Sequence, residues 1–333
     1  MAQDVAFWLY TGYLSVTYFI SLGKKRFSCG YFTQIHYFCK TGVFFKESSN
    51  TTVIITIADI LLLLLSGIVG GFIGGYLGIG GSPVYVVVFQ YFFMRIYGTQ
   101  LSGEEVVQLT IANTVFSRTF ASLAGCWKHL LNHNFYGKTV RTIAIPATIF
   151  SLLFTHLLAN INYSQTAFSI VFIAMFMPLL YKMLADNSRK KVFNHPYRIK
   201  VTFLNLAGAV SGILTAVSGL GTGFVLIPML NSLFNIKIRK VTSISLGVLF
   251  ITSLAATFYY MLVYRVEVQL PYTYGGISLL LSVPVMVGSL VFSPLGVTVS
   301  QCHSPRTIRI TFIVFCAIIT LNELASLAVN LYK

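Results

Sequence analysis

The chain has 333 residues, of which 56% are hydrophobic and only 9% carry a charged side chain. A soluble domain has about 25% charged residues, so the composition excludes a soluble protein and predicts an all-α polytopic membrane protein. The net charge of +15 reflects 8 acidic residues as much as 23 basic ones. No segment is long enough to form a separate basic domain, so nucleic acid is not an expected partner. The expected partner of such an apolar chain is the lipid bilayer.

Residues 1–50 are expected to form an N-terminal extension with a membrane-associated helix and a basic loop. Residues 5–22 are uncharged and apolar, no basic stretch precedes them, and no small-residue cleavage site follows. A removable signal peptide is therefore not expected. We predict one extra helix outside the repeated part of the chain.

Ten hydrophobic segments follow, and most are long enough to cross a bilayer as helices, which takes about 20 residues. They fall at 53–77, 83–97, 106–131, 138–159, 164–184, 201–217, 224–236, 241–263, 272–299 and 308–331. A basic connecting loop at 186–200 divides them into five and five. We predict a first transmembrane repeat at 51–185 and a second at 201–333.

The same glycine spacing occurs in both halves. One shift along the sequence superposes Gly71 on Gly212, Gly78 on Gly219 and Gly80 on Gly221. Glycine interrupts helices. Two matching interruptions at membrane depth indicate a transporter whose binding site lies between internal repeats.

The orientation of the halves has two interpretations. If all five segments of a half cross the membrane, the second half is inverted, and nearly every Lys and Arg of the repeats lies on one side, with only Arg95 and Arg265 on the other. If each glycine break joins two segments into one crossing, the halves are parallel. The positive-inside rule favours inverted repeats for the core, although the basic N-terminal loop would then face the opposite side.

Each glycine cluster is predicted to end one helix and to begin another. In lipid, irregular backbone is tolerated only where protein or a water-filled cavity surrounds it. Ser82 is a favoured N-cap and Pro83 a favoured first helical residue, and Thr222 with Gly223 would serve the matching helix. Free N–H groups at two such helix starts would favour an anion. Helix packing is the competing interpretation, and it is favoured for Gly67, Gly71 and Gly75.

Arg118 lies near the middle of the segment 106–131, too far from either end for its charge to reach water easily. A charge at this depth is costly and normally faces a cavity or a partner. One interpretation is a cationic anchor for an anionic substrate. The other is a structural ion pair with Asp59 or Glu323. Asp59 is also a candidate proton-coupling residue.

The candidate substrate-binding residues come from the two glycine clusters and from the hydroxyl-rich third segment of each half. They are Gly78, Gly80, Gly81, Ser82, Thr114, Arg118, Gly219, Gly221, Thr222, Gly223 and Ser245. No paired catalytic constellation is evident, so the chain is not expected to be an enzyme. No cofactor or metal is expected, because the pair His129 and His133 lacks further ligands.

These residues resemble the TauE/SafE family of membrane permeases. The run from Gly71 to Ser82 is similar to the repeated glycine signature of that family, and the stretch from Val241 to Ser253 resembles its hydroxyl-rich helix. Ser82 and Thr222 stand where the family pattern has glycine. The resemblance covers about 53–333 and implies transport of small sulfur-containing anions such as sulfite or organosulfonates.

We therefore expect a secondary transporter that moves small anions by alternating access at the repeat interface, with protons as a further partner. The plasma membrane is the favoured location. The alternative is a non-transporting integral membrane subunit or scaffold of a larger complex, since the glycine signatures are imperfect and residues 1–50 lie outside the resemblance.

Overall fold

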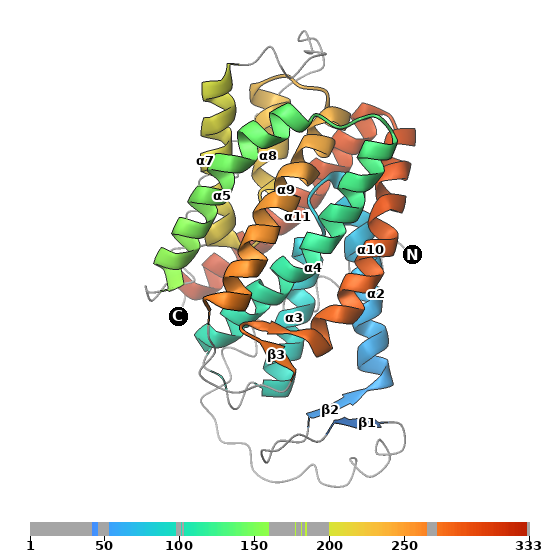
Figure 1. The fold of residues 1–333 in the computed structure, drawn as a ribbon, viewed down its shortest axis with the longest axis vertical. Coiled ribbons are helices and arrows are strands. Elements are labelled where there is room, and N and C mark those ends of the chain that lie inside the picture. Colours follow the sequence, from blue (N-terminus) through green and yellow to red (C-terminus); the bar gives the residue numbers. More distant parts are fainter. Residues whose placement is uncertain are drawn as a thin grey trace.

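The computed structural model describes residues 42–45, 53–97, 101, 103–159, 177, 181, 184, 200–264 and 272–331. Helices make up most of this part of the chain (Figure 1). They are α2 (Ile57–Leu77), α3 (Ser82–Tyr97), α4 (Gly103–Leu131), α5 (Gly137–Ala159), α7 (Val201–Ser218), α8 (Gly223–Pro228), α9 (Ile238–Leu262), α10 (Leu279–Cys302) and α11 (Pro305–Leu331). A π-helical turn, Met229–Leu233, continues α8.

The prediction of an all-α membrane protein is confirmed in outline. The helices α2, α5, α7, α9 and α10 are long and apolar enough to cross a membrane. The predicted segment 5–22 and nearly all of 164–184 lie outside the described residues.

Two short antiparallel hairpins correct the predicted helix boundaries. Strand β1 (Gly42–Phe45) pairs with β2 (Val53–Thr56), so the helix predicted from residue 53 begins at Ile57. The run Val-Ile-Ile-Thr is entirely β-branched, which favours a strand. Strand β3 (Thr273–Tyr274) pairs with β4 (Ile277–Ser278) around Gly275, and the helix predicted from residue 272 begins at Leu279.

Glycine allows α2 and α10 to pack backbone against backbone. A Cβ atom on Gly71 would lie 2.6 Å from the Cα atom of Ser289, a separation that no real side chain tolerates. Gly67 and Gly75 face the backbone of α10 in the same way, so the packing interpretation of these three glycines is confirmed. The contacting pairs are Gly67 with Val285, Gly71 with Ser289 and Gly75 with Ser293. Because the residue numbers increase in the same direction along both helices, α2 and α10 run parallel.

Helices α7 and α5 pack by the same device. Gly208 faces Ile143, and a Cβ atom on Gly212 would lie 3.0 Å from the Cα atom of Ala147. The residue numbers again rise together, so α7 and α5 also run parallel.

Helix α9 occupies the centre of the bundle. Of its apolar 18-residue window, 72% is buried, against 44% or less in the other apolar helices that could span a membrane. It crosses α4, where Arg118 contacts Ser253 and Gly125 faces Leu246. Because the residue numbers of these contacts increase along α4 and decrease along α9, the two helices run antiparallel.

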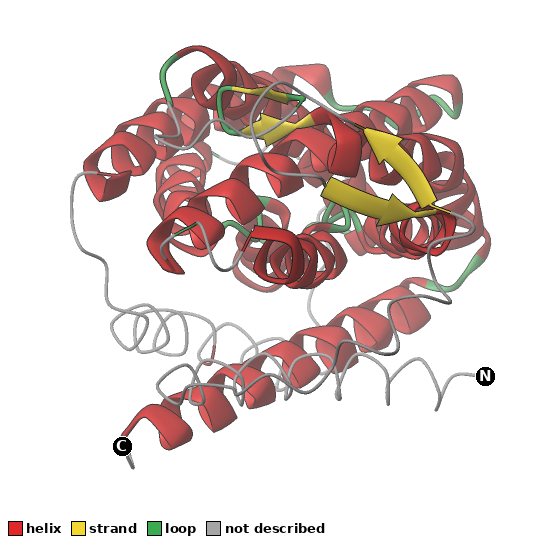
Figure 2. Ribbon diagram, turned by 90° about the horizontal axis from the view of Figure 1, so that it is seen from below, coloured by secondary structure: helices red, strands yellow, loops and turns green. Residues whose placement is uncertain are grey.

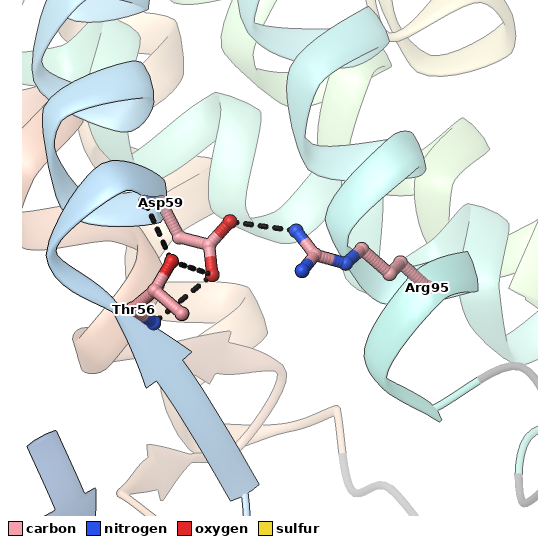
Figure 3. Close-up of polar contacts among 3 residues, drawn as sticks. All are labelled: Thr56, Asp59 and Arg95. Atoms are coloured by element: carbon pink, nitrogen blue, oxygen red, sulfur yellow. Dashed lines mark hydrogen bonds and ion pairs between the residues drawn. The ribbon is translucent and has the colours of Figure 1, made fainter. Parts of the chain in front are cut away.

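Helix α3 turns back along α2. Asp59, in the first turn of α2, forms an ion pair of 2.6 Å with Arg95, in the last turn of α3 (Figure 3). The two helices therefore form a hairpin whose apex is the first glycine cluster. Helix α11, which ends near the C-terminus, lies along one side of the bundle (Figure 2), and its Phe312 packs on Phe224 of α8.

Candidate functional site

Both predicted helix breaks are confirmed. Helix α2 ends at Gly78 with a left-handed φ of 83°, and α7 ends at Gly219 with a φ of 64°. Within the breaks, Gly80, Gly81 and Gly221 have φ values of 74°, 76° and 95°. A residue with a side chain would cost about 1–2 kcal/mol at each such position, so glycine is required here. We call residues 78–82 tip 1 and residues 219–223 tip 2.

The two tips lie against each other in the interior. A Cβ atom on Gly223 would lie 2.8 Å from the carbonyl oxygen of Gly78. That same oxygen accepts a hydrogen bond of 2.8 Å from the Ser245 hydroxyl of α9. Gly80 and Gly221 both face the side chain of Leu249. Segments from the two halves of the chain thus meet at one place, as the paired glycine spacing predicts.

Arg118 lies beside this contact and is 2% exposed. Its Nε donates to the Ser253 hydroxyl at 2.9 Å, and its Nη1 donates to the carbonyl oxygen of Gly219 at 2.6 Å. The guanidinium therefore binds the carbonyl oxygen of the residue that caps the end of α7, and its remaining N–H groups have no acceptor within the described part of the chain.

The interpretation of Arg118 as the ion-pair partner of Asp59 is wrong. The Asp59 carboxylate accepts from Arg95 and from the backbone N–H and hydroxyl of Thr56, and its own N–H completes a capping box with Thr56 (Figure 3). Asp59 lies in the first turn of α2, whereas tip 1 follows the last turn, so the structure does not bring Asp59 together with the other candidates. The side chain of Glu323 lies outside the described residues.

The predicted capping roles of Ser82 and Thr222 are also wrong. Ser82 is the first residue of α3, and the N–H groups of Val84 and Tyr85, which a cap would bind, donate to the carbonyl oxygen of Gly81 instead. Thr222 precedes α8, but its own carbonyl oxygen takes the available N–H groups. Both hydroxyls are thereby left free for another partner.

Unpaired donors occur in both tips and in the neighbouring helix α4. The hydroxyl oxygens of Ser82, Thr222, Thr114 and Ser117 are buried and have no hydrogen-bond partner among the described residues. The backbone N–H groups of Ser82 and Gly223 likewise have no acceptor in that part of the structure. A buried polar group without a partner costs about 1–3 kcal/mol, so a cluster of them indicates a position where another molecule supplies the acceptor.

The glycine at position 221 lies close to two donor groups. A Cβ atom there would lie 3.1 Å from Arg118 Nη1 and 3.5 Å from Ser82 Oγ. Donors of α4 and of tip 1 therefore border the same position in tip 2.

Sequence reasoning missed two members of the site, Leu249 and Ser253. With Ser245 they recur at every fourth residue of α9, which places them on one face of the helix. That spacing from Ser245 was the available signal.

Comparison with known proteins agrees with this architecture. Residues 62–322 match the family described as sulfite exporter TauE/SafE, a span that includes both tips and Arg118. A probable membrane transporter protein of Methanocaldococcus jannaschii is 24% identical over 253 residues, which cover 75% of this chain and 89% of the relative. No solved structure matches the chain.

The resemblance inferred from the glycine signatures is confirmed, and the apolar helices are those of an integral membrane protein. Because the family match covers most of its length, the chain belongs to the sulfite exporter TauE/SafE family.

Proposed function

We propose that the protein is a secondary transporter of small anions and that tip 1, tip 2 and Arg118 form its anion site. The observation that carries this proposal is that the buried Arg118 guanidinium of α4 and the unpaired Ser82 hydroxyl of tip 1 border the same position of tip 2, Gly221. The hydroxyls of Thr222 in tip 2 and of Thr114 and Ser117 in α4 are also buried and unpaired among the described residues.

The sign of the charge on the proposed ligand follows from which polar groups at the tips already have a hydrogen-bond partner in the protein. Two helix C-termini also end at the tips, and their carbonyl oxygens would attract a cation. The oxygen of Gly78 is occupied by Ser245, and that of Gly219 by Arg118. The guanidinium, the unpaired hydroxyls of the tips and the free N–H of Ser82 at the start of α3 are donors, and each of these favours an anion.

Inverted repeats belong to the same proposal. The first helix of each half packs on the fourth helix of the other, α2 on α10 and α7 on α5, with matching glycine contacts. The third helices, α4 and α9, run antiparallel. An inverted repeat would produce this reciprocal arrangement, with the site at the contact between halves. Rocking of one half on the other would then open the tips to either side of the membrane in turn.

The substrate class rests on the family. A sulfite exporter family points to sulfite, a sulfonate or another sulfur-containing organic anion, and each presents oxygen acceptors to the donors described above. Asp59 remains our candidate for proton coupling. Its ion pair with Arg95 holds the open end of the hairpin whose apex is tip 1, so protonation of Asp59 would loosen α3 from α2.

The test is uptake of radiolabelled sulfite and methanesulfonate into liposomes that contain the purified protein. Arg118→Met keeps the volume of the side chain but removes the charge. We expect uptake to fall by about 100-fold, because hydrogen bonds to charged groups contribute about 1.5–3 kcal/mol each. Arg306→Met, at an exposed position of α11, is the control and should transport normally.

Uptake by the wild type no greater than that of empty liposomes would overturn the proposal, as would equal uptake by the Arg118→Met variant. A chain that shows no uptake and always purifies with other membrane proteins would instead fit a scaffold.

A further inference from the structure

One face of α9 contacts both tips and Arg118. Ser245 donates to Gly78 of tip 1, and Ser253 accepts from Arg118. Leu249, one turn from each serine, is fully buried between them. It is the apolar member of an otherwise hydroxyl-bearing row.

The two methyl groups of Leu249 each meet a different tip. Its Cδ1 would lie 2.9 Å from a Cβ atom on Gly221, and its Cδ2 is the nearest atom to the position of a Cβ atom on Gly80. Arg118 borders the same two glycines, with Nη1 at 3.1 Å from the Gly221 position and its own Cβ at 3.8 Å from the Gly80 position. Leu249 of α9 and Arg118 of α4 thus flank the same two glycines of the tips.

Leu249 also occupies the position on α9 that Arg118 occupies on α4. Thr242 of α9 faces Gly78, where tip 1 begins, and Leu249 follows it two helical turns later. Ile111 of α4 faces Gly219, where tip 2 begins, and Arg118 follows it two turns later. Equivalent positions therefore carry a cation on one side and an apolar side chain on the other.

We propose that Leu249 determines the specificity of the site: it makes the site prefer anions with one charged group and one short apolar group over dianions. The charged group lies against Arg118 and the apolar group against the methyls of Leu249. This inference rests on the proposed function and deepens it. A second cation at position 249 would suit a dianion, whereas leucine leaves a second negative charge buried and uncompensated.

The experiment measures how alkanesulfonates of increasing chain length, from methanesulfonate to pentanesulfonate, compete with labelled methanesulfonate uptake into liposomes. Sulfonates stay ionised, so leakage of a neutral form does not confuse the measurement. In Leu249→Ala, competition by pentanesulfonate relative to methanesulfonate should rise at least about tenfold, since a single methylene in an apolar pocket changes selectivity by about 10–200-fold. Leu249→Phe should shift the preference toward methanesulfonate.

The matched control is Leu246→Ala. Leu246 is a fully buried leucine of the same helix, but it faces Gly125 of α4 rather than the tips. If Leu249→Ala fails to fold, Leu249→Met, which nearly conserves volume and is flexible, should still move the chain-length profile toward longer sulfonates.

A charge variant completes the test. Leu249→Lys should raise competition by ethane-1,2-disulfonate over methanesulfonate by at least about tenfold, as one added charge-assisted hydrogen bond implies.

The outcomes separate the two proposals. No uptake by the wild type overturns the proposed function. Arg118-dependent uptake in which the Leu249 variants have the same chain-length and charge profile as Leu246→Ala overturns the role of Leu249 alone.

Discussion

Gly221→Ala tests the geometry of the tips most directly. The new side chain would have to adopt a φ of 95°, which costs about 1–2 kcal/mol. Its Cβ would lie 2.9 Å from Leu249 Cδ1 and 3.1 Å from Arg118 Nη1. Leu249 can yield at its flexible end, but Nη1 is held by the Gly219 carbonyl at 2.6 Å. Displacement of the guanidinium adds about 1.5–3 kcal/mol, the contribution of one hydrogen bond made by a charged group.

The total is about 2.5–5 kcal/mol. In the proposed anion site it should weaken the apparent affinity by at least about 70-fold. Concentration-dependent methanesulfonate uptake gives the affinity, and thermal unfolding in detergent gives the stability. Gly275→Ala is the control for backbone strain, because Gly275 in the β3–β4 hairpin also has a positive φ, of 59°, but its Cβ would meet the α9 backbone at Tyr260 and Met261 rather than Arg118 or Leu249. It should lower stability and leave affinity unchanged. An affinity that falls equally in both variants would refute the reasoning.

Three further changes probe other contacts. Ser245→Ala leaves the Gly78 carbonyl without its side-chain donor and should lower the free energy of unfolding by about 1–3 kcal/mol. Ser245→Thr keeps a hydroxyl and should restore the stability. An unchanged melting temperature in the alanine variant would contradict this expectation. Gly71→Val must push α2 from α10 and should destabilise by at least about 3 kcal/mol in thermal unfolding, whereas Gly137→Val, where a Cβ has room, serves as control. Asp59→Asn breaks an ion pair whose arginine is half-exposed and whose aspartate is buried. The pair contributes about 1 kcal/mol, so the protein should stay folded, and stimulation of uptake by a pH gradient should disappear. Its persistence would exclude Asp59 as the proton carrier.

The features that sequence predicted well are those fixed by a single residue type. A glycine that must adopt a positive φ interrupts a helix wherever it stands, so the breaks at Gly78 and Gly219 occur where the pattern places them. The mid-segment position of Arg118 likewise predicts burial, because a helix has a fixed rise per residue.

The features it missed depend on contacts between distant segments. Arg118 and its acceptor Gly219 are 101 residues apart, and nothing in either local sequence identifies the other. Hydropathy alone also cannot distinguish a buried strand from a helix. The apolar pattern therefore predicts a helix that includes Val53–Thr56, where the structure has a strand. At the start of α3, the backbone geometry directs the N–H groups of Val84 and Tyr85 to the Gly81 carbonyl rather than to the Ser82 hydroxyl.

The reciprocal packing of first and fourth helices has a consequence for synthesis of the chain. When α7 leaves the ribosome, its partner α5 has already been made, and the Gly208–Gly212 face can be covered at once. Helix α2 must wait for α10, which is made near the end. Throughout that interval its glycine face lacks its native neighbour, so α2, the first of the described helices to be made, is among the last to complete its packing.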